Sequence, residues 1–115
     1  ISIHMVLSDR SRGLITAENL GQMKQDAFLV NTSRGPIVDQ AALLNMLRAG
    51  AIRGAAIDVY ETEPLPVDHP YRGLENAVLS PHMGYVTEET YRIFHGHSVE
   101  SIQAWHDGAP IRQLS

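Results

Sequence analysis

Short apolar segments alternate with polar, turn-forming segments along most of the chain. Four of the apolar segments are rich in β-branched or small residues and too short for helices, so they predict strands at about 1–7, 27–30, 54–59 and 77–79. The first of them alternates apolar and polar side chains from its first residue, Ile1. Because that residue is already inside a predicted strand, we expect the chain to be a fragment of a longer polypeptide.

Three longer segments have the spacing and capping residues of helices. They span about 17–24, 40–49 and 87–107, and Thr16, Asp39 and Thr87 are their expected N-caps. The middle segment has one apolar face and is followed by Gly50, a common residue at a helix end.

Strands that alternate with helices predict an α/β fold, with a parallel sheet flanked by helices on both faces. In such sheets, ligands bind at the carboxyl ends of the strands. Polar residues follow three of the predicted strands at this position. They are Thr32, Ser33 and Arg34 after one strand, Asp58 to Glu63 after the next, and His82 after the last. The sequence therefore predicts a functional site at one edge of the sheet.

Composition excludes several other classes of protein. The 115 residues are 43% hydrophobic and 19% charged, which is typical of a globular domain and not of a disordered chain. Cysteine is absent, which excludes disulfides, thiolate nucleophiles and cysteine-based zinc sites. This absence fits a cytoplasmic protein but leaves the compartment open.

The sequence also argues against nucleic acid, a membrane or a metal ion as a partner. The net charge is −4 and the basic residues are scattered singly, so we expect no nucleic-acid partner. Apolar runs are too short to span a membrane, and we expect no membrane association. His95 and His97 would point about 200° apart on a helix, which is poor geometry for one metal, so no metal site is expected.

An arginine, a histidine and two acids at the predicted edge suit the oxidation of a hydroxy acid. The Arg34 guanidinium matches a carboxylate or carbonyl oxygen, and His82 can exchange a proton with a hydroxyl group. Glu63, bonded to the other ring nitrogen, would fix the tautomer and favour the protonated ring. Asp58 can accept a bond from a carboxamide. Each residue also has an ordinary alternative: Arg34 and Glu63 as solvated loop residues, and His82 and Asp58 as caps of backbone groups.

The segments NTSRGPIVDQAALLNML, GAAIDVYETEP and LSPHMGY occur in this order and separation. They closely resemble the carboxyl-terminal half of the nucleotide-binding domain of the D-isomer-specific 2-hydroxyacid dehydrogenases, which include phosphoglycerate, D-lactate and glyoxylate/hydroxypyruvate enzymes. The segment SIHMVLSDRSRGLITAENLGQMK is similar to the same family, so the resemblance covers essentially the whole chain. It implies the second half of a Rossmann-type NAD(P)-binding domain over residues 1–108, including the helix at 87–107, followed by a tail at 109–115.

The resemblance also implies roles for single residues. It makes Arg34 the substrate-orienting arginine, Glu63 the partner of the histidine, and His82 the acid/base. The residues expected near the cofactor are His4, Thr32, Ser33, Arg34, Asp58, His82 and Gly84. One departure is Val6, where members of the family commonly have proline; it affects the expected shape of the cofactor wall and not the chemistry.

The resemblance implies a fragment of an NAD(P)-dependent D-2-hydroxyacid dehydrogenase that acts on a small 2-hydroxy or 2-keto acid. The glycine-rich phosphate loop and the substrate domain of the family are not in this chain, which contains no G-x-G-x-x-G motif. We therefore expect weak NAD binding by the chain alone, and a homodimer for the whole protein.

Two alternatives stay open. One is a cofactor-sensing corepressor of the same family, which can retain the same residues. The other is a formate- or phosphite-oxidising relative; Glu63 argues against formate enzymes, which have glutamine there.

Overall fold

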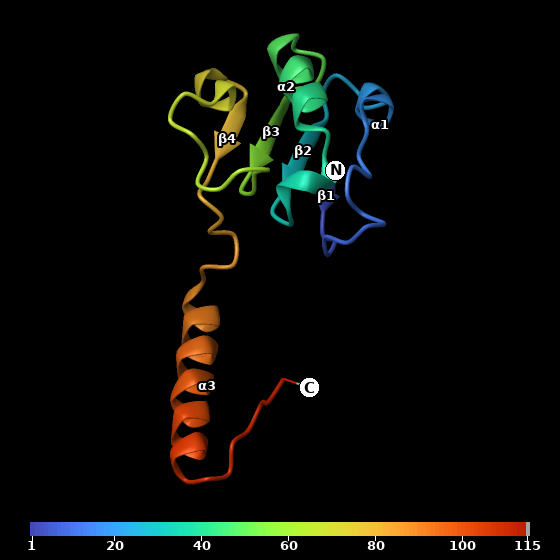
Figure 1. The fold of residues 1–115 in the computed structure, drawn as a ribbon. Helices are drawn as coiled ribbons and strands as arrows, with labels where there is room; N and C mark the ends of the chain where they lie inside the picture. Colours follow the sequence, from blue (N-terminus) through green and yellow to red (C-terminus); the bar gives the residue numbers. More distant parts are fainter. Residues whose placement is uncertain (115) are drawn as a thin grey trace. The chain divides into compact units, whose positions relative to one another are not determined.

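Four parallel strands form one sheet, in the order β1-β2-β3-β4 along both the chain and the sheet (Figure 1). The computed structural model describes residues 1–114. The strands are β1 (Ser2–Ile3), β2 (Phe28–Asn31), β3 (Gly54–Ile57) and β4 (Ala77–Leu79). This confirms the predicted α/β class with a parallel sheet and flanking helices. Because all strands are parallel, their carboxyl ends meet at one edge.

The first strand is shorter than the sequence predicts. Only Ser2 and Ile3 pair with β2, opposite Val30 and Asn31. The prediction of a strand to residue 7 was therefore wrong. The physical reason is that β2 ends at Asn31, where the side-chain oxygen accepts the N–H of Ser33 and turns the chain away. No β2 backbone remains to pair with the residues that follow Ile3.

Helices α1 (Ala17–Gly21) and α2 (Gln40–Arg48) begin at the predicted caps. Thr16 accepts the N–H of Asn19 at 3.3 Å, and Asp39 accepts the N–H of Ala42 at 2.9 Å. The first helix ends three residues earlier than predicted, because the N–H groups of Gln22 and Met23 bond to carbonyls only three residues back or fewer.

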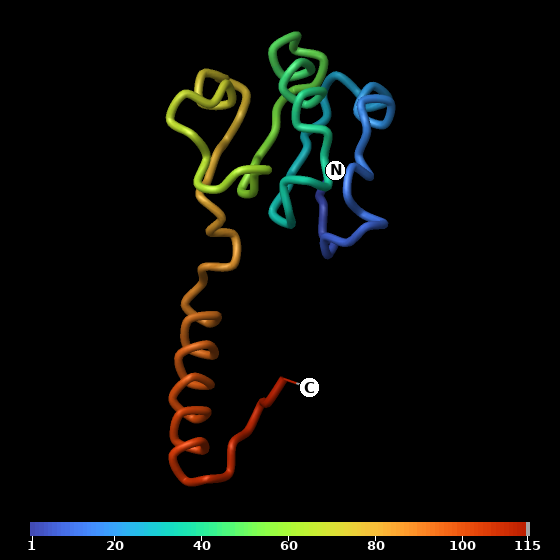
Figure 2. The backbone as a smooth tube through the Cα atoms, in the orientation of Figure 1, coloured from blue at the N-terminus to red at the C-terminus, as the bar shows by residue number. Residues whose placement is uncertain are grey.

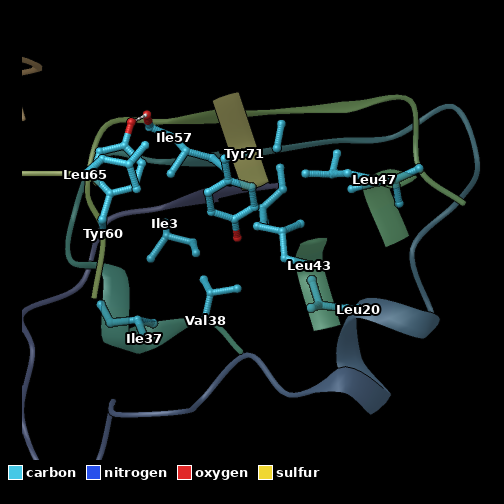
Figure 3. Packing of buried hydrophobic residues seen from close by; sticks show 13 residues of the cluster. Ile3, Leu20, Ile37, Val38, Leu43, Leu47, Ile57, Tyr60, Leu65 and Tyr71 are labelled. Carbon is cyan, nitrogen blue, oxygen red and sulfur yellow. Dashed lines mark hydrogen bonds between the residues drawn. The ribbon is translucent and has the colours of Figure 1, made fainter. Parts of the chain in front are cut away.

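The core lies between these helices and one face of the sheet. Leu20 of α1, Leu43 and Leu47 of α2 and Ile57 of β3 belong to one buried cluster (Figure 3). Leu29 of β2 belongs to the same cluster. On the opposite face, Phe28 is 53% and Val78 71% exposed. Within residues 1–83, α1 and α2 pack against one face of the sheet, and cover of the other face stays a prediction.

The chain divides into two compact units, residues 1–83 and 84–115. The second unit contains α3 (Glu88–His106), which begins at the predicted cap Thr87 and has no buried residue. The path of the backbone can be followed in Figure 2. Ser115, the last residue of the expected tail, lies outside the described residues. No helix among residues 1–114 has the length and apolar character needed to cross a membrane.

Candidate functional site

Three loops leave the sheet at the edge where the sequence places the site. They follow β2 at Thr32–Gly35, β3 at Asp58–Glu63 and β4 at Ser80–His82. This arrangement is a direct consequence of the parallel topology, since every strand delivers its carboxyl end to the same edge. The prediction that these polar residues share one edge is confirmed.

Glu63 and His82 form a direct pair. His82 Nδ1 lies 2.7 Å from Glu63 Oε2, and the other oxygen of Glu63 accepts the N–H of Tyr60 at 2.9 Å. Because a carboxylate only accepts hydrogen bonds, Nδ1 carries the proton and, in the neutral ring, Nε2 carries the lone pair. Both side chains are about one-third exposed, at 35% for His82 and 36% for Glu63. The pair is therefore fixed in geometry but open to small molecules.

Three neighbouring groups of the site lower the pKa of Glu63. The hydrogen bond from His82 lowers the pKa of Glu63 below its usual value, the bond from Tyr60 N–H and the positive charge of Arg34 act in the same direction, and partial burial opposes them. Glu63 is therefore a carboxylate at neutral pH, and Arg34 is close enough for its charge to act on the same group.

Gly35 lets the Arg34 loop pack directly against the loop that carries Glu63. A Cβ built on Gly35 would overlap the carbonyl group of Tyr60 and lie 2.6 Å from the amide nitrogen of Glu61. Only glycine fits this close approach of two backbones. A short 3₁₀ helix, η1 (Gly35–Ile37), starts here, and the Arg34 guanidinium donates to Ser33 O at 2.6 Å.

Asp58 is buried, with 3% exposure, and lies directly after β3. Its Oδ1 accepts the N–H of Met83 at 2.8 Å and the hydroxyl of Ser80. The carboxylate therefore bonds to the turn that contains His82. Its expected contact with a nicotinamide amide stays a prediction.

His4, Ser33 and Arg34 line one cavity of about 410 Å³, with apolar walls from Met5, Val6 and Leu7. Ser33 holds this cavity in shape, because its hydroxyl donates to Ile3 O at 2.6 Å and accepts the N–H of Met5 at 3.1 Å. His4 Nε2 lies 2.7 Å from Ser2 Oγ. Thr32 is exposed beside them. The structure thus brings together three residues that the sequence assigned to the cofactor.

A second cavity, of about 260 Å³, is lined in part by the Glu63–His82 pair. Its polar lining comes from Glu63, His82, Ser80 and Arg72. Gly84 begins the second unit, which is described separately from these residues. No group of three or more histidine, aspartate or glutamate residues suited to a metal ion is found in the part of the chain that the structure describes.

Residues 1–84 match the model of the family described as D-isomer specific 2-hydroxyacid dehydrogenase, NAD binding domain. The match includes every loop of the sheet edge. This chain belongs to that family. The three sequence motifs that suggested the resemblance are the segments that build the site.

Several known proteins resemble the chain in sequence and in structure. A glyoxylate reductase of Thermofilum pendens is 48% identical over 89 residues, which cover 77% of this chain and 26% of the relative. The crystal structure of a putative D-3-phosphoglycerate dehydrogenase oxidoreductase from Ralstonia solanacearum superimposes with a TM-score of 0.87 and 37% identity, covering 96% of this chain and 32% of that one.

A third relative is known with a cofactor. The D-isomer specific 2-hydroxyacid dehydrogenase of Xanthobacter autotrophicus Py2, in complex with NADPH and MES, gives a TM-score of 0.74 at 36% identity, over 99% of this chain and 47% of that chain. This chain spans about a quarter of the length of the curated relatives it matches.

Three residues that shape the site, Gly35, Tyr60 and Ser80, were not among the residues predicted from the sequence. Gly35 and Ser80 each stand immediately beside a predicted site loop or strand end, which is the only local signal of their roles. Their contacts lie with residues more than 20 positions away, Tyr60 and Asp58 respectively.

Proposed function

We propose that this chain supplies the acid/base half of the active site of an NAD(P)-dependent dehydrogenase, which interconverts a D-2-hydroxy acid and its 2-keto acid. The observation that carries the proposal is the 2.7 Å bond between His82 Nδ1 and Glu63 Oε2, next to the loop of Arg34. A histidine held by a carboxylate beside an arginine is suited to move the hydroxyl proton of an anionic substrate.

His82 Nε2 is the atom that exchanges the proton. In the oxidation it takes the hydroxyl proton while the C–O bond becomes a carbonyl, and in the reduction it returns a proton to the carbonyl oxygen. Glu63 favours the protonated ring, because its negative charge lies against Nδ1. Arg34 orients the substrate through its carboxylate, for which the planar guanidinium provides paired donors.

The cofactor supplies the two-electron acceptor or donor of the reaction. The cavity of about 410 Å³ suits its nicotinamide end, because Met5, Val6 and Leu7 present apolar walls to a flat ring while Arg34 and His4 provide a polar rim. Asp58, Thr32 and Gly84 complete the proposed contacts with the cofactor. Whether the cofactor is NAD or NADP depends on residues outside this chain.

The family resemblance supports the remaining parts of the proposal. The substrate is a small 2-hydroxy or 2-keto acid, the whole protein is a homodimer, and it works in the cytoplasm, where a chain without cysteine is at no disadvantage. Residues 1–108 form the second half of the NAD(P)-binding domain and residues 109–115 a tail.

Replacement of His82 by alanine in the whole protein tests the proposal. Turnover should fall by about 10² to 10⁴ in both directions, as is typical for loss of a general acid/base, while the dissociation constant of the cofactor changes little. His95→Ala, on the exposed helix α3, is the matched control and should retain wild-type turnover. A His82→Ala enzyme with near-normal kcat at its pH optimum would show that the proton is moved by another group.

A further inference from the structure

The turn that carries His82 is attached to the end of β3 through all the polar groups of Ser80. The N–H of Ser80 donates to Ile57 O at 3.1 Å, and its carbonyl accepts the Tyr60 hydroxyl at 3.0 Å. The Ser80 hydroxyl donates to Asp58 Oδ1. The two backbone bonds are available to any residue at position 80, whereas the bond to Asp58 requires a hydroxyl group.

Asp58 continues this attachment past His82. Its carbonyl accepts the N–H of His82 at 2.8 Å, and its Oδ1 accepts the N–H of Met83 at 2.8 Å. One carboxylate oxygen therefore holds the turn on both sides of the histidine, through Ser80 before it and Met83 after it. Because Asp58 is 3% exposed, these bonds are largely shielded from competition with water.

The backbone of His82 needs such support. Its φ angle is 58°, in the left-handed region that residues with a Cβ rarely adopt. A conformation of this kind persists only where the surrounding contacts determine it. At His82 the same conformation directs the ring towards Glu63, so a loosened turn also loosens the catalytic pair.

We propose that Ser80 is a positioning residue of this enzyme. Its hydroxyl, bonded to Asp58, holds the turn in the form that brings His82 Nδ1 to Glu63 and presents Nε2 to the substrate. The inference rests on the acid/base role proposed for His82. It also means that Asp58 holds the turn of His82, in addition to its expected contact with the nicotinamide amide.

The tautomer of His82 reports this positioning without any measurement of activity. A neutral imidazole in water favours the form with the proton on Nε2, whereas the bond to Glu63 requires the proton on Nδ1. If the turn moves and Nδ1 leaves Glu63, the tautomer should revert. Long-range ¹H–¹⁵N correlation spectra of histidine-labelled protein, recorded where the ring is neutral, distinguish the two forms.

The experiment compares Ser80→Ala with Ser80→Thr in the whole protein. The alanine variant lacks the hydroxyl and should lose the Nδ1–H tautomer as the main form, with kcat reduced by about 10- to 100-fold, as expected for a small displacement of a catalytic group. The threonine variant retains the hydroxyl and should keep both the tautomer and most of kcat.

Ser98→Ala is the control, because it removes an exposed serine hydroxyl that bonds only to the local carbonyl of Phe94 among the contacts described. If Ser80→Ala fails to fold, Ser80→Val takes its place, as valine has the shape of threonine without the hydroxyl. The proposal is overturned if the variants without the hydroxyl keep the Nδ1–H tautomer and near-normal kcat. An active His82→Ala enzyme would instead reject the proposed function, and the spectra of the Ser80 variants would still decide how the turn is held.

Discussion

Gly35 lies so close to the carbonyl group of Tyr60 that no side chain fits between them. This contact joins the loop of Arg34, after β2, to the loop of Glu63, after β3. The two loops come from neighbouring strands, whose register sets Asn31 opposite Ile57. The distance between the guanidinium and the carboxylate therefore depends on a glycine that takes no part in the chemistry.

Replacement of Gly35 by alanine should lower both stability and activity. The added Cβ must push the two loops apart, which we expect to cost about 1–3 kcal/mol of the free energy of unfolding, a range typical of overpacking. Urea denaturation measures the loss. Gly21→Ala is the matched control, because the described residues leave open space around Gly21; its stability should be unchanged or higher. Equal stability of the Gly35→Ala and wild-type proteins would mean that the loops separate freely.

Glu63→Gln should change the pH dependence of the reaction in the whole protein. The Glu63 carboxylate places a negative charge 2.7 Å from His82 Nδ1, and glutamine removes that charge while it keeps a hydrogen-bond acceptor. Oxidation requires the neutral ring, so its activity in the variant should extend to lower pH. Reduction requires the protonated ring, so the variant should lose reductase activity near neutral pH.

Profiles of kcat/KM against pH in both directions measure these shifts. Glu61→Gln is the matched control, since Glu61 is an exposed acid of the same loop, and its profiles should match the wild type. Profiles of Glu63→Gln that are unchanged in both directions would show that the pair has no part in proton transfer.

Tyr71 should make the fold sensitive to alkali. It is 2% exposed and donates to Gln40 O at 3.2 Å; burial, reinforced by the negative charges of Glu61 and Asp39, raises the pKa of its hydroxyl well above the usual 10. A raised pKa in the folded state means that its contribution to stability is complete below pH 10. This contribution is lost above pH 10, where the unfolded chain ionises first.

Tyr71→Phe should lower the free energy of unfolding at neutral pH by about 0.5–1.5 kcal/mol, because the hydrogen bond of the hydroxyl is lost. Above pH 10 the wild type should lose stability relative to this variant, by at most about 1.4 kcal/mol per pH unit. Denaturation curves recorded from pH 8 to 11 test this, with Tyr91→Phe at an exposed position as the control. If the free energies of unfolding of wild type and Tyr71→Phe differed by the same amount across that range, the raised pKa of Tyr71 would be contradicted.

The 115-residue chain should bind NAD only weakly. It contains no G-x-G-x-x-G motif, and this motif at a helix N-terminus is a major source of affinity for the pyrophosphate group. Calorimetric titration of the chain with NAD, beside the whole protein, measures the difference. Micromolar binding by the chain would reveal a phosphate site among its own residues, and the loop at 32–35 would be the first place to look.

Local interactions explain why much of the fold could be predicted from sequence. The caps Thr16, Asp39 and Thr87 each bond to an N–H three residues away, so the sequence alone marks where α1, α2 and α3 begin. Short apolar runs mark the strands, and the alternation of strands with helices determines that the sheet is parallel. That topology in turn places Arg34, Glu63 and His82 at one edge.

Only the tertiary structure decided how far the strands extend and how the site is held. β1 stops at Ile3 because its partner strand ends, and the outer face of the sheet is exposed at Phe28; neither fact is a property of a local pattern. Asp58 and Ser80 are 22 residues apart, and their bond depends on the register of β3 with β4. The sequence by itself determined which chemical groups reach the edge, because strand direction is encoded locally. Packing between the strands decided which of these groups form hydrogen bonds with one another. Such bonds depend on distances between segments that are far apart in the sequence, and no single segment contains that information.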